Sequence, residues 1–342
     1  MTRYIIRRLL FLPVILFGVT ILIFGILQLL DPAERAALYV KDVPKNPNAV
    51  KEIIRKYGLD KPIWEQYADW MGKVVKGDLG WSRTAQRPVT EAILYYFPAT
   101  LELALLSILP IILGGVFLGV QAAVHRDKAI DHSARVFSMV GTSFPSFVFA
   151  LLMLMIFYAN LQWFPPGRLS DDIQRIVNEP SFRQFTGMYT LDGLLNGRLG
   201  VTLDALRHLL LPVITLAFIN WAIFVRVTRT SMLDVLNQEY VRTARAKGLK
   251  EKVVINTHAL RNALIPIATL GGLVFIGLLN GVIITETVYN FRGMGWFAAN
   301  AALRLDVISV LGITLFSAGL LVLSNLVVDV LYGFLDPRVR VS

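Results

Sequence analysis

The 342-residue chain contains no cysteine. Disulfide bonds, thiolate metal ligands and cysteine nucleophiles are therefore excluded. Histidine is almost as scarce, and the four that occur are dispersed without an HExxH pair: His125, His132, His208 and His258. Because a metalloprotease zinc site needs paired histidines on one helix face, we predict no metal site in this chain.

Phosphate-binding and catalytic motifs are also missing. The sequence holds no GxxxxGK[ST], the glycine-rich loop that cradles nucleotide phosphates. No spacing of residues indicates a serine or threonine nucleophile that is activated by a neighbouring base. We therefore expect the chain to bind no cofactor, neither ATP nor magnesium, and not to be an enzyme. Any energy that it uses must come from a partner.

Charged residues are few and apolar residues are clustered. Only 17% of the chain is charged, against about a quarter in a soluble domain, while 55% is hydrophobic and the mean hydropathy is +0.58. Six uncharged runs of 22, 22, 32, 17, 24 and 22 residues cover 9–30, 103–124, 136–167, 209–225, 262–285 and 307–328. About 20 helical residues cross the hydrocarbon layer, whereas buried core helices give shorter runs. We predict an all-α integral membrane protein with six transmembrane helices.

The first run follows three arginines and could be mistaken for a secretory signal. The apolar region of a signal is usually about 7–15 residues long and is followed by a small-residue cleavage site. Here the run is 22 residues long and ends at Asp31-Pro32. We therefore expect a retained first helix, with residues 1–30 forming an N-terminal tail and the first span.

The distribution of positive charge predicts the orientation. The connection 226–261 carries eight arginines and lysines against three acidic residues, whereas 31–97 has 11 against nine and 168–204 has four against five. Because cytoplasmic loops carry the positive excess, both termini are expected in the cytoplasm. Attraction of Arg226, Arg229 and Arg261 to anionic lipid is an alternative explanation for part of the charge. No nucleic-acid-binding module accompanies it, so nucleic acid is not an expected partner.

The external segment 31–97 is predicted to be an ordered cap. A first short helix begins near Asn48 and ends at Gly58, and a second begins at Pro62 and ends before Gly77. The second helix places Trp64, Tyr67, Ala68 and Met71 at helical spacing. Packing of this face on the membrane domain is favoured over contact with another protein. The remaining residues, 98–342, form the predicted membrane core, with an external loop 168–204 and a cytoplasmic loop 231–260.

The cytoplasmic loop is expected to fold into two short helices. Glu239 to Lys247 contains no helix breaker, and Gly248 suits the left-handed residue that closes a helix. Lys250 to His258 can form a second helix before the chain re-enters the membrane near Asn262. Ala244 and its small neighbours at the bend favour insertion into a groove on another protein over a solvated loop.

The same loop carries a family resemblance. TARAKG, nine residues, then HALRNALIP resembles the coupling motif of ABC-importer permeases, which reads Glu-Ala-Ala, three residues, Gly, nine residues, Ile-x-Leu-Pro. Arg242, Thr243 and Ala244 take the Glu-Ala-Ala places and Gly248 matches the glycine, while residues 258–261 depart in the manner of the dipeptide/oligopeptide permease family. Further segments agree over nearly the whole chain: RPVTEAILYYFPATLELAL, GDLGWS, VRVTRTSMLDVLNQEYVRTARAKGL, ETVYNFRGMG and DVLYGFLDPRVR. The chain resembles the B-type permease subunits of that family.

The resemblance implies a type I ABC-importer permease fold with two cytoplasmic coupling helices, in the inner membrane of a bacterium or the cell membrane of an archaeon. It implies a heterodimer with a second permease, two cytoplasmic ATPases that bind ATP and magnesium, and an external substrate-binding protein. The substrate would be a dipeptide or oligopeptide, with oligosaccharides, nickel complexes and glutathione as alternatives. The residues expected to couple to the ATPases are Glu239, Tyr240, Arg242, Thr243, Ala244, Arg245, Ala246, Lys247, Gly248 and His258.

The resemblance also places the segment 286–295 near the external mouth, where Glu286, Gly293 and Gly295 are candidates for contact with the binding protein. An ion-coupled secondary transporter is the alternative from another class, because such proteins mark their pathways with carboxylates inside the membrane. The candidates lie near helix ends, where pairing or capping is favoured: Glu102, Glu286, Asp306 and Asp329. Three prolines are expected inside helices, where they permit kinks: Pro110, Pro145 and Pro212.

Overall fold

The computed structural model describes residues 2–38 and 47–335. This part of the chain is helical apart from one short hairpin, in which β1 (Trp81–Ser82) pairs antiparallel with β2 (Arg87–Pro88). Before the hairpin come α1 (Thr2–Leu27), α2 (Pro32–Leu38), α3 (Pro47–Lys56) and α4 (Ile63–Val75). After it come α5 (Val89–Val124), α6 (Ala129–Ser143), α7 (Ser146–Met153), the π-helix η1 (Leu154–Asn160), α8 (Asp171–Val177), α9 (Tyr189–Leu195) and α10 (Leu199–Leu236). The chain ends with α11 (Glu239–Ala246), α12 (Glu251–Val253), the π-helix η2 (Val254–Ala259), α13 (Leu260–Leu279), α14 (Ile283–Val288), α15 (Met294–Leu303) and α16 (Val307–Leu335).

The prediction of an all-α membrane protein is confirmed. Four helices of the described chain are long and apolar enough to cross a membrane: α5, α10, the helix Glu251–Leu279 and Val307–Val328 of α16. The broken pair α6 and α7–η1 adds a fifth candidate. The helix α1 has 26 residues, within which Pro13–Leu27 is the shorter apolar stretch. The count of six spans therefore stays a prediction.

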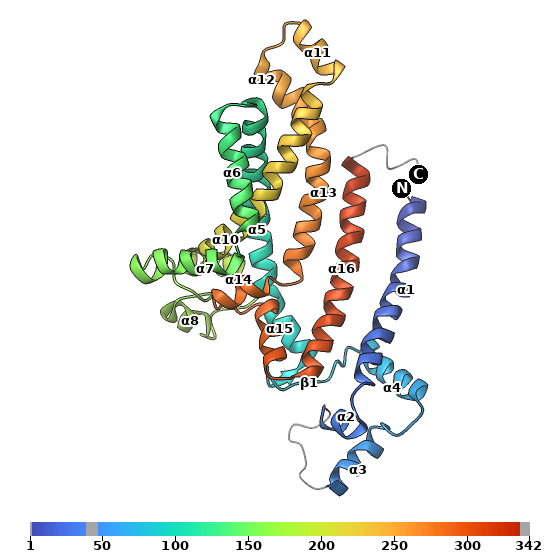
Figure 1. The fold of residues 1–342 in the computed structure, drawn as a ribbon. Helices are drawn as coiled ribbons and strands as arrows, with labels where there is room; N and C mark the ends of the chain where they lie inside the picture. Colours follow the sequence, from blue (N-terminus) through green and yellow to red (C-terminus); the bar gives the residue numbers. More distant parts are fainter. Residues whose placement is uncertain (1, 39–46, 336–342) are drawn as a thin grey trace.

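The longest apolar run, 136–167, does not form one straight helix. The axes of Ala129–Ser143 and Ser146–Asn160 differ by 102° at the break between them. Phe144 is extended, and Pro145 caps the start of α7, because proline lacks an N–H and disfavours helical backbone in the residue before it. The expectation that Pro145 lies inside a helix is therefore wrong, whereas Pro110 and Pro212 do lie inside α5 and α10. Figure 1 shows α7 running across the direction of α5 and α6.

The centre of the protein is the close pair α5 and α10. A Cβ atom added to any of three α5 glycines would overlap a side chain of α10, so the absence of a side chain lets the two helices approach. The glycines Gly114, Gly115 and Gly119 face Trp221, Phe224 and Thr228 in that order. Trp221 also donates an interhelical hydrogen bond to the carbonyl of Pro110, at 2.8 Å. Apolar side chains of α13 pack on this pair.

The segment predicted to form the external cap packs on α1, as the sequence favoured. The Tyr67 hydroxyl lies 2.8 Å from Thr20 Oγ1, and the Tyr67 ring makes an edge contact with Phe24 at a centroid distance of 5.3 Å. Trp64 does not share this face, because it is 74% exposed. Gly58 and Gly77 take left-handed backbone at the two predicted helix ends.

The two ends of the molecule carry different elements. Figure 1 places α11 and α12 at one end and the cap with the hairpin at the opposite end. The first turns of α1 and the last turns of α16 lie toward the end that carries α11. The expected boundary between cap and core, 97/98, falls inside α5, which begins at Val89. The cap therefore joins the core through a continuous helix.

Candidate functional site

The loop 231–260 is shaped by one glycine. α11 begins at Glu239 and ends at Ala246, and Gly248 then adopts φ +75°. The Gly248 amide donates to the carbonyl of Arg245 at 2.9 Å, which closes the helix end. A left-handed residue at this place is the usual way to end a helix, and glycine adopts it without steric cost. The predicted turn at Gly248 is confirmed.

The second short helix is not a separate element. From Glu251 the chain runs through the π-helix η2 into α13 as one helix, Glu251–Leu279. The expectation that Lys250 to His258 forms its own short helix is wrong. No breaker stands between Lys250 and Pro266, and Pro266 is accommodated inside α13. The turn at Gly248 therefore joins a short helix directly to a membrane span (Figure 1).

The inner face of α11 packs on the start of this long helix. Val241 and Val254 have no exposed surface, and Ala244 is 5% exposed. Ala244 is small because it packs against η2 of its own chain, which corrects the expectation that its size serves a groove on another protein. The Tyr240 hydroxyl accepts a hydrogen bond from Asn262 Nδ2 at 2.7 Å, which adds a second tie between α11 and α13.

The outer face of α11 is exposed and charged. The exposed residues of this turn are Glu239, Tyr240, Arg242, Thr243, Arg245, Ala246, Lys247 and Gly248, and His258 is partly buried on η2. Arg245 donates to Glu251 across the turn, and this hydrogen bond raises the pKa of the Arg245 guanidinium. Three partly exposed apolar side chains, Tyr240, Leu249 and Val253, lie among the charges. A mixed surface of this kind suits contact with another protein.

At the other end of the core, Glu286 is the centre of a buried hydrogen-bond network. Its side chain has no exposed surface. Thr100 Oγ1 donates to Glu286 Oε1 at 2.8 Å, and the Trp296 amide donates to Oε2 at 2.9 Å. The Met294 amide donates in turn to Thr100 Oγ1 at 2.7 Å. One carboxylate thus joins α5, α14 and α15.

Two glycines make room for this carboxylate. A Cβ atom on Gly293 would lie 2.7 Å from Glu286 Oε2, and one on Gly295 would lie 3.2 Å from the same atom. The structure therefore brings together the three candidate residues of the segment 286–295, which are Glu286, Gly293 and Gly295. The Glu286 side chain is enclosed by its own chain, so it cannot contact another protein in this structure. This corrects the expectation that Glu286 contacts the binding protein.

Two of the other carboxylates that the sequence singled out, Glu102 and Asp306, pair or cap as expected. Glu102 of α5 accepts from Arg168 Nη2 at 2.9 Å and from the amide of Thr190, in the first turn of α9, at 2.7 Å. These two hydrogen bonds hold the loop 168–204 against α5. Asp306 precedes α16 and accepts from the Ser309 hydroxyl at 2.7 Å and the Thr84 amide at 2.9 Å. Asp329 lies outside the residues whose side chains are described.

One ion pair was not anticipated. Asp131 of α6 has no exposed surface and accepts from Arg229 Nη2 of α10 at 2.7 Å and from Arg135 Nη2 at 3.2 Å. Arg229, for which attraction to anionic lipid was an alternative explanation, is therefore held by a carboxylate of its own chain. The pair of Asp131 with Arg135 could have been predicted, because residues four apart on a helix lie close together. Nothing in the sequence indicated that Arg229 completes it.

The sequence matches known protein families and individual relatives over almost its full length. Residues 115–341 match the family described as binding-protein-dependent transport system inner membrane component, and residues 1–104 match its N-terminal component. The chain is 41% identical over 340 residues to the di/tripeptide transport system permease protein DppB of Pseudomonas aeruginosa (strain UCBPP-PA14), covering 99% of both chains. It is 37% identical over 341 residues to the dipeptide transport system permease protein DppB of Escherichia coli (strain K12), covering 99% of both. It is 37% identical over 342 residues to the oligopeptide transport system permease protein AppB of Bacillus subtilis (strain 168), covering 99% and 100%.

Proposed function

Because this chain belongs to the family of binding-protein-dependent transport system inner membrane components, we propose that it is the permease subunit of an ABC importer for short peptides. The relatives named for di- and tripeptides, dipeptides and oligopeptides match it over almost its full length, which supports a peptide substrate. The chain forms part of the passage through the membrane. It carries no phosphate-binding loop, so separate ATPase subunits supply the energy.

The feature that carries this proposal is the joint between α11 and the long helix Glu251–Leu279. The buried contact of Val241 and Ala244 with Val254 fixes α11 to the first turns of that helix. A push on the exposed face of α11 is therefore passed to a membrane span without an intervening flexible loop. This supports a role for the turn around Gly248 in receiving movement from a cytoplasmic ATPase.

The partners follow from this arrangement. Two ATPases dock on the side of the membrane that carries α11, with Arg242, Arg245 and Lys247 on the contact face. A substrate-binding protein docks on the opposite side, where the cap lies. A second, related permease completes the passage as a heterodimer. Both termini of this chain lie in the cytoplasm.

Uptake of a labelled peptide tests the proposal. Removal of the gene should abolish uptake of radiolabelled dialanine, and reintroduction should restore it. Changing the phosphate-binding lysine of the partner ATPase to alanine should abolish uptake as well. Collapse of the proton gradient with cellular ATP maintained should leave most uptake intact. Uptake that survives the ATPase change but fails with the gradient would instead establish an ion-coupled transporter.

A further inference from the structure

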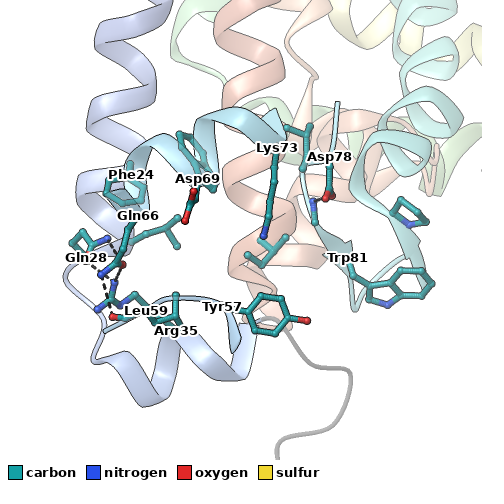
Figure 2. Close-up of a pocket in the computed structure, with 16 residues that line it drawn as sticks. Phe24, Gln28, Arg35, Tyr57, Leu59, Gln66, Asp69, Lys73, Asp78 and Trp81 are labelled. Atoms are coloured by element: carbon teal, nitrogen blue, oxygen red, sulfur yellow. Dashed lines mark hydrogen bonds between the residues drawn. The ribbon is translucent and has the colours of Figure 1, made fainter. Parts of the chain in front are cut away.

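A cavity of about 310 Å³ lies between α1 and the cap, and Figure 2 shows the residues that line it. The cap is at the end of the molecule opposite to α11 (Figure 1). Water occupies about 30 Å³ per molecule, so the space exceeds that of a few bridging waters and falls at the lower end of the range for ligand pockets. Its walls come from α1, α2, α4 and the hairpin. Residues from these walls are Phe24, Arg35, Asp69, Trp70, Lys73 and Trp81.

The unusual residue in the wall is Arg35. Its side chain is only 8% exposed, although arginine is almost never buried without a charged partner. Nη1 donates to the amide oxygens of Gln28 at 2.6 Å and Gln66 at 2.7 Å, as Figure 2 shows. The Nε–H of Arg35 has no hydrogen-bond partner. Within residues 2–38 and 47–335, no carboxylate forms an ion pair with Arg35.

Among the residues that the structure describes, the positive charge of Arg35 therefore has no counterion. The guanidinium stays protonated at any ordinary pH, and a buried charge is costly unless an opposite charge compensates it. The two glutamine oxygens satisfy one nitrogen but carry no net charge. An anionic group is the partner that would compensate this charge, and Arg35 lines a cavity that such a group can enter.

The position of Arg35 is fixed in advance. Gln66 donates through Nε2 to the carbonyls of Leu59 at 3.1 Å and Lys61 at 2.7 Å. These two bonds orient the Gln66 amide so that its oxygen faces Arg35. A guanidinium held in place before binding loses little entropy when an anion arrives. Nη1 already donates to both glutamines and Nε is enclosed, so Nη2 is the nitrogen that would meet a carboxylate or phosphate.

The rest of the wall offers both signs of charge and aromatic surface. Lys73 extends from α4 toward Tyr57, with its Nζ 5.5 Å from the ring centroid (Figure 2). The carboxylates of Asp69 and Asp78 line the same cavity, and Asp69 Oδ2 also accepts a hydrogen bond from Lys61 Nζ at 3.3 Å. Phe24 and Trp70 supply an apolar surface, with their ring centroids 5.7 Å apart. The lining therefore matches a ligand that carries a negative group, a positive group and an apolar part.

We propose that this cavity binds a small zwitterion, whose carboxylate or phosphate pairs with Arg35 and whose ammonium group meets the acidic side chains. Two sources supply this chemistry, a free dipeptide and the headgroup of phosphatidylethanolamine in the outer leaflet. The site belongs to the cap, and it does not rest on the proposed transport function. A ligand here would bridge α1, α2 and α4 and so would set how firmly the cap sits on the core.

Binding to the purified complex in detergent tests the proposal in two arms. In the first, dialanine is titrated and followed by calorimetry, with N-acetyl-dialanine as the probe that lacks the ammonium group. In the second, dioleoyl phosphatidylethanolamine is added and followed by native mass spectrometry. We expect one site to fill in at least one arm, and the arm that responds identifies the source. Absence of binding in both arms overturns the proposal.

Two variants define the site. Arg35→Gln should weaken binding by at least about tenfold, since one partner of a charge-assisted pair is lost. Lys51→Gln, an exposed change in the same cap, should leave the affinity unchanged. Because Arg35→Gln could loosen the cap, Asp69→Asn serves as a second variant at a more exposed position. It should remove the preference of the parent for dialanine over its acetylated form, or reduce phosphatidylethanolamine binding several-fold.

The contrary results are equally definite. Unchanged affinity in Arg35→Gln would show that the ligand sits elsewhere. Equal binding of acetylated and free dialanine by the parent, with no lipid bound, would show that the acidic wall selects nothing. Either result rejects the zwitterion site while leaving peptide uptake by the complete importer untouched.

Discussion

Arg245 and Glu251 form a two-point ion pair across the turn at Gly248, with Nη2 to Oε1 at 2.7 Å and Nε to Oε2 at 3.2 Å. Both side chains are largely exposed, at 41% and 55%, and exposed ion pairs contribute little to stability. The turn is therefore held chiefly by the backbone of Gly248 and by the buried contact of Ala244. The first two predictions test these contributions.

The first prediction concerns the backbone of Gly248. With φ at +75°, a β-branched residue there is strained by roughly 1–2 kcal/mol. No atom lies within 4 Å of an added Cβ, so the strain comes from the backbone alone. Gly248→Val should reduce ATPase retention on the purified permease and peptide uptake, at normal membrane levels. Gly248→Asn is the matched control and should keep most activity, because asparagine tolerates left-handed backbone. Full activity in the valine variant would refute the role assigned to the bend.

The second prediction concerns the buried face of α11. Ala244→Trp places a large ring in the contact with Val241 and Val254, and overpacking of this kind costs about 1–3 kcal/mol. We expect α11 to be displaced and stimulation of the partner ATPase by loaded binding protein to be lost. The double variant Lys250→Gln and Lys252→Gln should have little effect. The assay is ATP hydrolysis by the reconstituted complex, and the reverse outcome would favour electrostatic attraction as the main contribution.

A third prediction tests the space beside Glu286. Gly293→Ala would bring a methyl group into Thr100 Oγ1 and to 2.7 Å from Glu286 Oε2, which the buried network cannot absorb without moving. We expect a loss of about 1–3 kcal/mol in stability, measured as a lower unfolding temperature in detergent. Gly277→Ala in α13 is the control, because no atom lies within 4 Å of an added Cβ there. Equal unfolding temperatures for both variants would contradict the packing described.

The fourth prediction concerns pH. Burial alone would raise the pKa of Asp306, but hydrogen bonds from Ser309 and Thr84 outweigh it and hold the pKa below its usual value. The stabilisation is then complete above the unfolded pKa of about 3.9 and is lost as the pH falls through the lower folded value. Asp306→Asn should be less stable than the parent at pH 7 by about 1–3 kcal/mol. This difference should shrink below about pH 4, as thermal unfolding between pH 3 and pH 7 can show. A difference that is constant with pH would exclude the charged form of Asp306 as the stabilising one.

The fifth prediction concerns orientation. Since the chain has no cysteine, single introduced cysteines can be labelled without background. Lys51→Cys and Asp172→Cys should react with an impermeant maleimide in whole cells, and Lys247→Cys should react only after the cells are opened. Reaction of the cysteine at 247 from outside would reverse both the topology and the assignment of α11 to the ATPase side.

The sequence was a good guide wherever the chemistry is local. Apolar runs predict membrane helices because the hydrocarbon layer demands them, and Gly248 was correctly expected to be left-handed because few other residues suit a helix end. The break at Pro145 could not be predicted in this way, because it does not depend on local chemistry alone. A proline inside an apolar run can kink a helix or end it, and only the surrounding packing decides which.

The contacts between distant segments could not be read in the same way. The hydrogen bond from Thr100 to Glu286 spans 186 residues, and the Arg229–Asp131 pair spans 98. Glu286 was a candidate for contact with a partner because the family resemblance places its segment near the external mouth, whereas its burial depends on α5 and α15 closing around it. Ala244 was recognised as necessarily small, but the neighbour that requires this lies in its own chain rather than in another.

The glycine contact between α5 and α10 bears on how the protein can change shape. Because side chains of α10 occupy the space above Gly114, Gly115 and Gly119, neither helix can slide or roll without a steric clash. We therefore expect the two helices to move as one rigid body during a transport cycle. We expect the movements that open and close a passage to fall instead on joints at its edges, such as the break before Pro145 and the left-handed Gly281 after α13.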